Sequence, residues 1–341
     1  MRKIYRQWLC MAVLLCQITA QAAENGAVVR GSVKDVQGNP IAGVVVTDGK
    51  NMTATDNRGM YLLDTDPVRQ PMVYISTPAD YVLPEKNGIA DGFYRYQDAG
   101  KTENQCDFIL QKREKKTDEF VFIPISDPQV KNEKQLERFR SETIPDLVYT
   151  VDSLNVPETI GMQLGDLVWD AMNLYTPYRT TISNLGLTMF QVMGNHDFNL
   201  QYADMERTAE PAKGYGEKNY YEMFGPTDYS FNVGKVHVIA MKDIDYEGGK
   251  KYTERFTEEQ LEWLKKDLSY VPEGTTVFLN VHAPVANTTV EGGDNVRNAN
   301  ALFRILRPYK AHIFSGHTHF YENTLPAAGI YEHNIGAACG A

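Results

Sequence analysis

The sequence predicts an α/β domain that is preceded by a small all-β domain. From residue 121 onward, apolar runs of five to seven residues alternate with segments of helical periodicity, which is the pattern of an α/β sheet. Residues 24–113 instead contain short β-branched runs separated by Gly, Pro, Asn and Asp, which is typical of a small β-sandwich. Between them, residues 114–118 are polar and charged and are predicted to form a solvated linker.

The first 23 residues have the composition of a secretory signal peptide. Arg2, Lys3 and Arg6 precede an apolar core from Trp8 to Ile18, and small residues for cleavage follow at 20–23. This core is too short to span a hydrocarbon layer of about 30 Å, so a membrane anchor is the weaker alternative. We therefore expect an exported protein, periplasmic or extracellular, without a transmembrane segment.

The chain is acidic. It carries 34 Lys+Arg and 44 Asp+Glu, and removal of the signal segment with its three bases leaves a net charge of −13. A chain of this charge lacks the basic footprint of a protein that binds the nucleic-acid backbone. A small phosphate ester is not excluded, because bound metal ions can invert the local field.

Two cysteines, Cys106 and Cys339, remain after removal of the signal segment. An exported compartment permits a disulfide between them. Two unpaired thiols are the alternative, because spacing does not reveal connectivity.

Residues 24–113 are predicted to contain strands without a catalytic constellation. Their acidic residues stand in turns, where Asp and Asn favour the backbone conformation. We therefore expect a structural or docking module, with strands at 27–33, 41–47, 60–63 and 72–76. The pattern Gly31-x-Val33, Gly38-x-Pro40, Gly43-Val44-x-Val46, Thr55-Asp56 and Gly59-x-Tyr61 resembles the carboxypeptidase regulatory-like (transthyretin-like) domain, a Greek-key sandwich.

Residues 119–341 are predicted to alternate strands and helices. Pro145 is expected to break or kink the helix at 133–151. Thr257 is expected to cap a helix and to form a capping box with Gln260. Gly234 is expected to form the turn of a hairpin over 229–240. Further helices are expected after Asp170 and over 297–306. Apolar strands are predicted at 121–126, 159–164, 187–193, 276–281 and 311–315.

Polar side chains follow each of these five strands, where an open α/β sheet builds its sites. They are carboxylates, imidazoles and amides without a thiolate, which are ligands suited to Mn²⁺, Fe or Zn²⁺. The groups are Asp127-Pro128-Gln129, Gly165-Asp166, Gly194-Asn195-His196-Asp197, His282 and Gly316-His317-Thr318-His319.

In this order, the five groups resemble the motifs of the calcineurin-like metallophosphoesterases, over about residues 120–320. The resemblance implies a four-layer α/β sandwich, with two mixed β-sheets flanked by helices. One group departs from the family pattern, which has Asp-x-His where this chain has Asp127-Pro128-Gln129.

The resemblance also implies two divalent metal ions that share Asp166. Three interpretations of Gln129 stay open: a weaker first site, a harder ion such as Mn²⁺, or a partly degenerate site. A Gln here resembles the Mn²⁺-dependent ADP-ribose and CDP-alcohol pyrophosphatase branch, which favours Mn over Fe or Zn. The implied ligands are Asp127, Gln129, Asp166 and His319 for the first ion, and Asp166, Asn195, His282 and His317 for the second.

The implied reaction is hydrolysis of a phosphate ester by a metal-bridging hydroxide, with His196 at the leaving oxygen. Asp170 or Asp197 is expected to orient this imidazole, and a purely structural Asp197 is the alternative. The substrate is expected to be a small molecule or a cell-envelope phosphoester with a diester, monoester or pyrophosphate bond. A catalytically weak receptor for phosphorylated ligands and a structural cell-surface module are the competing hypotheses. Oligomeric state is not indicated.

Several other residues have open roles. His237 and His312 are interpreted as core or surface residues, and His333 as a residue that approaches the site or stands apart. Trp169 and Phe198 either line a pocket or pack. Residues 199–228, rich in Tyr, are expected to form a lid or substrate loop. The small-residue ending predicts a truncated chain that lacks an edge of its second sheet.

Overall fold

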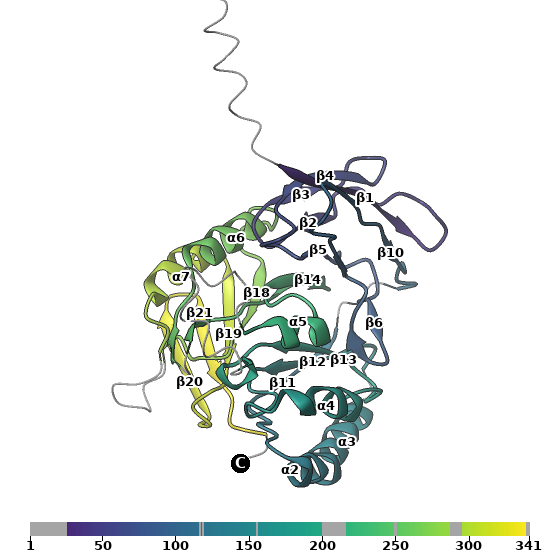
Figure 1. Cartoon of the computed structure of the whole chain (residues 1–341). Coiled ribbons are helices and arrows are strands. Elements are labelled where there is room, and N and C mark those ends of the chain that lie inside the picture. Colours follow the sequence, from purple (N-terminus) through teal and green to yellow (C-terminus); the bar gives the residue numbers. More distant parts are fainter. Residues whose placement is uncertain are drawn as a thin grey trace, which may run out of the picture.

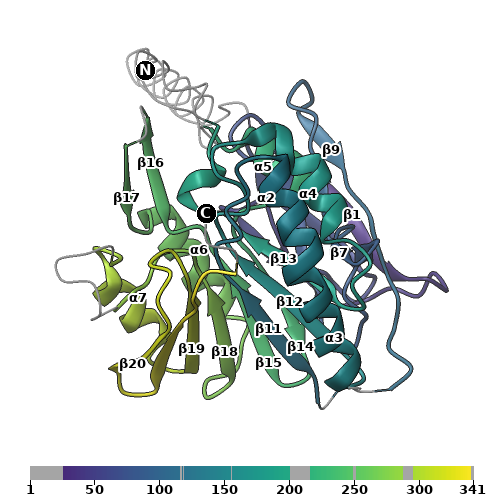
Figure 2. The same cartoon turned by 90° about the horizontal axis from the view of Figure 1, so that it is seen from below.

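Two central β-sheets face each other, and helices cover the outer face of each in the computed structural model (Figures 1 and 2). The structure describes residues 26–338 except 116, 118, 155, 200–215, 249–250 and 287–294. The predicted α/β four-layer arrangement with an all-β N-terminal region is confirmed.

The first central sheet has the strand order β11-β12-β13-β7-β6, and its strands β11, β12, β13 and β7 are parallel. The strands are β11 (Val121–Ile125), β12 (Thr159–Leu164), β13 (Thr188–Val192), β7 (Ile89–Ala90) and β6 (Glu85–Lys86). Its helical layer comprises α2 (Glu133–Arg138), α3 (Ile144–Leu154), a 3-10 turn η2 (Met172–Leu174) and α4 (Tyr175–Thr181).

The second central sheet has the order β14-β15-β18-β19-β21-β20, with a parallel centre and antiparallel edges. Its strands are β14 (Tyr229–Val233), β15 (Val236–Ala240), β18 (Thr276–Asn280), β19 (Lys310–Ser315), β20 (Glu322–Ala327) and β21 (Ile330–Asn334). The helices α6 (Glu258–Leu268) and α7 (Ala299–Leu306) lie along its outer face. The helix α5 (Lys218–Phe224) and the hairpin β16 (Ile244–Gly248)–β17 (Lys251–Glu254) complete this domain.

Aromatic side chains join the two sheets. Phe190 of β13 stacks on Phe231 of β14 with ring centroids 4.2 Å apart, and Phe122 of β11 meets Phe278 of β18 edge-on at 5.2 Å. Large aromatic rings bury much apolar area per residue, so these pairs fix the separation of the sheets.

The helix predicted over 133–151 is divided just before Pro145, in line with the break or kink expected there. Pro145 is the second residue of α3. The preceding residues form a π-helical turn, η1 (Phe139–Thr143), in which Ile144 N donates to the carbonyl of Phe139. This wider turn lets the chain pass the proline ring and continue.

Other local predictions are confirmed. Thr257 caps α6, and Gln260 completes the capping box. The hairpin of β14 and β15 turns at Gly234, whose φ of 54° suits glycine.

The N-terminal sandwich consists of two four-stranded sheets. One has the order β10-β1-β4 with β9 also on β1, and the other has the order β3-β2-β5-β8. The strands are β1 (Ala27–Asp35), β2 (Val45–Thr47), β3 (Met52–Ala54), β4 (Met60–Thr65), β5 (Met72–Ser76), β8 (Tyr94–Tyr96), β9 (Glu103–Gln105) and β10 (Phe108–Leu110).

This sandwich is bonded to both central sheets. Its β7 pairs with β13 at Ile89 and Met189, and Thr77 after β5 bridges to Phe231 of β14. Strands from within residues 24–113 thus extend the central layers, a connection that the sequence did not indicate. We conclude that the sandwich covers one edge of each central sheet.

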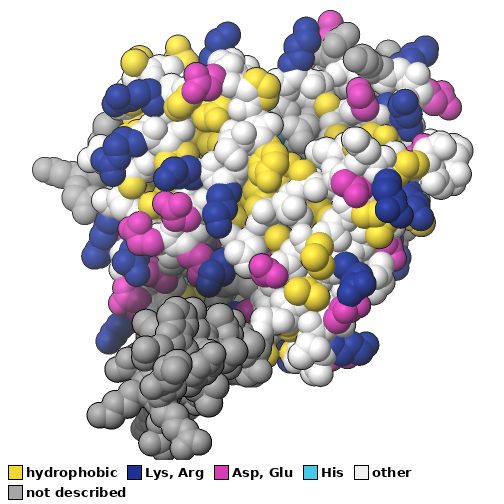
Figure 3. Space-filling view, turned by 90° about the horizontal axis from the view of Figure 1, so that it is seen from above, with side chains coloured by type: hydrophobic (Ala, Val, Ile, Leu, Met, Phe, Trp, Pro, Cys, Tyr) yellow, Lys and Arg dark blue, Asp and Glu magenta, His cyan; other side chains and the backbone are white. Residues whose placement is uncertain are grey.

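The outer end of the sandwich carries basic and acidic side chains interspersed with apolar ones (Figure 3). Met60 and Leu62 on β4 and Ile109 on β10 are exposed. Among the described residues, no helix has the length and apolarity needed to cross a membrane.

Some predictions lie outside the described residues. These are the signal peptide, Cys339, and Tyr202 and Tyr215 of the expected lid. Cys106 is buried as a free thiol. The described part of the expected lid forms α5, and its Tyr220 is buried in the core.

A buried polar network fastens the sandwich to α6 and the second sheet. His237 Nε2 lies 2.7 Å from Asp267 Oδ2, with side chains 3% and 2% exposed. Ser230 Oγ donates to Asp267 Oδ1 at 2.8 Å and also lies 2.9 Å from Ser76 Oγ of the sandwich. The interpretation of His237 as a core residue therefore agrees with its position.

Replacing His237 with Leu is expected to lower the free energy of unfolding by about 3–5 kcal/mol, because Asp267 would be left as a buried charge without its partner. Urea unfolding measures this change. The matched control is His312→Leu on strand β19 of the same sheet. Its partly buried imidazole has no carboxylate partner among the described residues, and we expect a loss of about 1 kcal/mol or less. Equal losses in the two variants would show that the buried pair has no special weight.

Candidate metal centre

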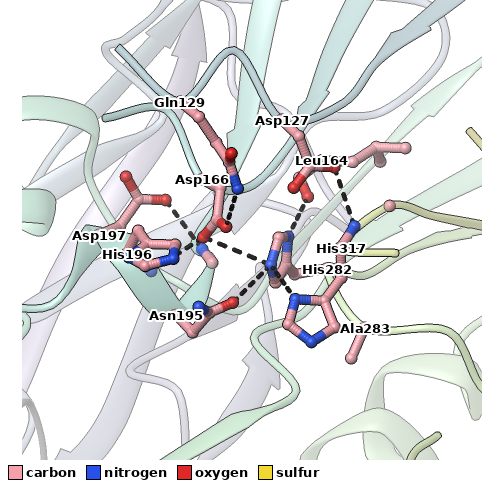
Figure 4. Close-up of polar contacts among 12 residues, drawn as sticks. Asp127, Gln129, Leu164, Asp166, Asn195, His196, Asp197, His282, Ala283 and His317 are labelled. Carbon is pink, nitrogen blue, oxygen red and sulfur yellow. Dashed lines mark hydrogen bonds and ion pairs between the residues drawn. The ribbon is translucent and has the colours of Figure 1, made fainter. Parts of the chain in front are cut away.

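The carboxyl ends of the two central sheets meet at one edge, and the predicted site residues gather there (Figure 4). Asp127 follows β11, Asp166 follows β12 and Asn195 follows β13. From the second sheet, His282 follows β18, and His317 and His319 follow β19. The two sheets thus contribute carboxylates and amides from one side and imidazoles from the other.

The backbone at this edge is strained. Most non-glycine residues avoid positive φ, and holding one there costs about 1–3 kcal/mol. Of the eight described non-glycine residues with positive φ, six are predicted site residues. They are Asp127 (50°), Gln129 (46°), Asp166 (52°), Asp170 (54°), His317 (68°) and His319 (61°). Strained backbone persists only where the surrounding structure holds it, and residues of this kind cluster at functional sites.

Glycines let these segments approach each other closely. A Cβ on Gly194 would lie 2.3 Å from both the backbone nitrogen and Oδ1 of Asp166. Gly165 has a φ of 90°, and a Cβ there would lie 2.5 Å from His282 Nδ1. Only a residue without a side chain fits at either position.

The four residues predicted for the second metal ion converge. Around His282 Nε2 lie Asn195 Oδ1 at 2.9 Å, His317 Nδ1 at 3.1 Å and Asp166 Oδ1 at 3.3 Å. One ligand atom each from Asp166, His282 and His317 falls within 4.8 Å of the others. This is the spacing expected of side chains that share one cation.

The imidazole of His282 is oriented for ligation. Its Nδ1 donates to the carbonyl oxygen of Leu164 at 2.7 Å, which leaves Nε2 as the coordinating atom. Burial alone would lower the pKa of His282, but the adjacent Asp166 carboxylate raises it to about 10. Burial would raise the pKa of Asp166, yet the His282 charge holds it below its usual range.

The residues predicted for the first metal ion are joined in two pairs. Gln129 Nε2 donates to Asp166 Oδ2 at 2.9 Å, and His319 Nε2 lies 3.5 Å from Asp127 Oδ1. Asp127 Oδ2 accepts from the backbone nitrogen of His317 at 2.9 Å and from the Ser126 hydroxyl. Asp127 and Gln129 are buried, whereas His319 is exposed at the rim.

Two buried oxygens at this first set fit a cation. Gln129 Oε1 and Asp127 Oδ1 accept no hydrogen bond from the described residues, and the contact of Asp127 Oδ1 with His319 Nε2 is an ion pair at 3.5 Å. A buried polar atom without a partner is costly, and a metal ion would satisfy both oxygens. The donor set of carboxylate, amide and imidazole suits a first-row divalent ion.

Asp170, rather than Asp197, holds the His196 imidazole. Asp170 Oδ1 lies 3.0 Å from His196 Nδ1. Burial would lower the pKa of His196, but the hydrogen bond to Asp170 and nearby carboxylates raise it.

Asp197 instead fastens the backbone. Its carboxylate accepts from the backbone nitrogens of Leu167 at 3.0 Å, Val168 at 3.3 Å and Gly194 at 2.9 Å. The side chain is fully buried, and burial together with the charge of Asp166 raises its pKa to about 7. These contacts favour the structural alternative for Asp197 over the catalytic one, because both oxygens accept from backbone N–H groups, whereas Asp170 contacts the His196 ring.

Two buried carboxylates behind His282 were not predicted from the sequence. Asp243 Oδ1 accepts from the backbone nitrogens of His282 at 3.1 Å and Ala283 at 3.2 Å. Glu332 accepts from Val285 and Ala286 in the same loop at 2.6 and 2.7 Å. Asp243 follows the apolar strand β15, so the pattern that revealed the ligands also applied to it, whereas Glu332 inside β21 gave no signal.

The remaining aromatic and histidine predictions are resolved by packing. Phe198 is buried and stacks on Tyr246, so it does not line a pocket. His312 and His333 contact each other across β19 and β21 at 3.0 Å, which places His333 in this pair. Trp169 stacks on His196 with ring centroids 4.0 Å apart.

Family comparison agrees with this geometry. The model of the calcineurin-like phosphoesterase matches residues 120–321, and the model described as the N terminal of calcineurin-like phosphoesterase matches residues 27–113. The chain therefore belongs to the calcineurin-like phosphoesterase family. The likeness of residues 24–113 to carboxypeptidase regulatory-like domains stays a prediction.

Similar solved structures include a dimetal phosphatase from Danio rerio, at 16% identity and a TM-score of 0.47, covering 64% of this chain and 88% of that one. A phosphopantetheinyl hydrolase from Mycobacterium tuberculosis matches at 12% identity and a TM-score of 0.41, covering 65% of this chain and 91% of that one. A 5'-nucleotidase from Candida albicans matches at 12% identity and a TM-score of 0.41, covering 67% of this chain and 48% of that one. Among curated protein sequences, none matches this chain.

Membership defines the class of protein. The chain is a metal-dependent phosphoric ester hydrolase, and two divalent metal ions are the cofactors that this class implies.

Replacing Gly194 with Ala is expected to reduce bound metal several-fold, because the new methyl group would displace Asp166 from the position that both ligand sets share. Elemental analysis of the purified protein measures this. Gly100→Ala is the control, since its nearest contact, Asp98 Oδ1, is 3.2 Å away in an exposed turn. Unchanged metal content in Gly194→Ala would contradict the close approach.

Proposed function

We propose that this chain is an exported two-metal phosphoesterase that cleaves a phosphorus–oxygen bond in a small-molecule or cell-envelope phosphate ester. The supporting observation is the position of Asp166. Its Oδ2 receives the Gln129 amide of one ligand set, and its Oδ1 lies beside His282 of the other. A single carboxylate that touches both sets is what a shared pair of cations requires.

Divalent ions held there would supply an activated water and neutralise charge on the phosphoryl oxygens. Asp127, Gln129, Asp166 and His319 would hold one ion, and Asp166, Asn195, His282 and His317 the other. The chain's own residues set the orientation of these ligands: Leu164 fixes His282, and the Ser126 hydroxyl and His317 backbone fix Asp127.

His196 is the proposed proton donor to the leaving oxygen. Its Nδ1 is held by Asp170, and its Nε2 has no hydrogen-bond partner among the described residues. Its backbone nitrogen donates to Asp166 Oδ1 at 2.9 Å, which ties the donor to the metal centre. An imidazole in this arrangement can give its Nε2 proton as the ester bond breaks.

We favour Mn²⁺ over Fe and Zn²⁺ because the neutral amide of Gln129 replaces an imidazole, and oxygen ligands suit a harder ion. The signal-like residues 1–23 support export to the periplasm or the cell exterior. Diester, monoester and pyrophosphate bonds all fit the proposed chemistry.

A substrate panel tests the proposal directly. Bis-p-nitrophenyl phosphate, p-nitrophenyl phosphate and a nucleotide pyrophosphate are offered to metal-free protein and to protein supplied with Mn²⁺, Fe²⁺ or Zn²⁺. We expect turnover of at least one substrate that requires metal and disappears in Asp166→Ala. Turnover that survives chelation, or none with any ester, would overturn the proposal.

Replacing Gln129 with His is expected to tighten the weaker of two metal-binding steps about tenfold or more, because imidazole is the better ligand for a first-row ion. Calorimetric titration of metal into the metal-free protein measures this. The control is Gln163→His, because the buried Gln163 amide donates to the Tyr178 hydroxyl and belongs to neither ligand set. If Gln129→His leaves both binding steps unchanged, Gln129 does not face a metal ion.

A further inference from the structure

A three-residue stack lies beside the metal centre. The Trp169 indole and the His196 imidazole are nearly parallel, at 22°, with centroids 4.0 Å apart. The Lys131 ammonium lies 5.2 Å from the centre of the same indole.

The backbone holds this stack in place. Trp169 N donates to the carbonyl of Val130 at 3.0 Å, and Val130 pairs with Val168 in a parallel bridge. Asp170 N donates to the carbonyl of His196 at 3.0 Å. The loops after β11, β12 and β13 are thereby stitched together at the point where the two rings meet.

We propose that Trp169 is a positioning residue that fixes the plane of the His196 ring; this inference rests on the proposed function of His196. The bond from Asp170 holds Nδ1 but leaves the ring free to turn about that contact. A parallel indole at 4.0 Å removes this freedom and leaves the Nε2 direction set. Aromatic rings in such contact prefer a defined relative orientation.

The stack also excludes a different role for Trp169. The His196 imidazole occupies one face of the indole, and the Lys131 ammonium also lies over the ring, so the indole is engaged by the chain's own side chains and is not an open stacking surface. Loss of the indole should therefore act on the protonation of the leaving oxygen rather than on substrate affinity.

The leaving group makes this role measurable. A p-nitrophenolate ion leaves without much help from an acid, whereas phenolate and alkoxide ions need the proton. In Trp169→Leu we expect kcat to fall about 10- to 100-fold more on phenyl and alkyl esters than on the matching p-nitrophenyl ester, with KM within about threefold, because small misplacements of a catalytic group carry losses of this order. Trp169→Phe, which keeps an aromatic face, should recover most of the difference.

Two control variants separate positioning from general damage. Trp263→Phe removes a buried indole of α6 that bonds Thr47 Oγ1 at 3.2 Å, away from the site, and should not change the leaving-group ratio. Lys131→Met keeps the covering chain without its charge and should leave the ratio within about threefold. Equal losses of Trp169→Leu on both leaving groups, or a loss confined to KM, would overturn the proposal.

A measurement that does not need turnover tests the position of the His196 ring even if the proposed function fails. If no ester is hydrolysed by the parent protein, that function fails, and the ring geometry is then judged by NMR of the histidine side chains. In the parent we expect His196 carbon-bound protons shifted upfield by the indole and sharp; in Trp169→Leu they should lose that shift and show motion. An unchanged, rigid His196 ring in Trp169→Leu would show that Asp170 alone positions it.

Discussion

The structure depends on one carboxylate, that of Asp166, at the point where two sheets meet. Gln129 reaches it from the loop after β11, the His196 backbone from the turn after β13, and His282 from the second sheet. The approach is possible only because Gly194 has no side chain and because the backbone of Asp166 is held at a φ of 52°. Strain of this kind persists only where surrounding contacts hold it, and here buried Asp197 and Asp243 clamp the neighbouring loops.

The N-terminal sandwich contributes to the same rigidity. It adds β7 to the first sheet and bridges to β14 of the second, so it restrains both sheets whose ends carry the ligands. The buried pair of His237 and Asp267 with Ser76 adds a polar connection. We infer that the sandwich helps to set the relative position of the sheets, and through it the distance between the two ligand sets.

The sequence indicated the candidate site residues better than the buried carboxylates that hold the loops behind them. The proposed ligands follow strongly apolar strands, and polar residues at such ends are conspicuous, so the sequence alone indicates Asp127, Asp166 and His282 as candidates. Asp243 follows the same rule but has no motif around it. Glu332 lies inside β21, where its burial depends on the distant loop at Val285 and Ala286, and such long-range contacts leave no local pattern.

The fold predictions also succeeded for features that depend on local sequence and failed for features that depend on long-range contacts. Hydrophobic periodicity predicts the central strands, and the Thr257–Gln260 capping box predicts the start of α6, because both depend on neighbours in sequence. It failed where tertiary contacts decide. β6 and β7 are two-residue strands that depend on the pairing of β7 with β13. β20 at the sheet edge contains a proline, and its neighbour β21 has a mixed pattern. The interruption before Pro145 takes the form of a π-turn, and no local sequence pattern indicates that form.

The most direct measurement is anomalous diffraction from crystals of the protein loaded with Mn²⁺. We expect two manganese peaks per chain, both within coordination distance of Asp166. One should lie on the side of Asp127 and Gln129, and the other on the side of Asn195 and His282. A single peak, or two peaks that do not share Asp166, would contradict it.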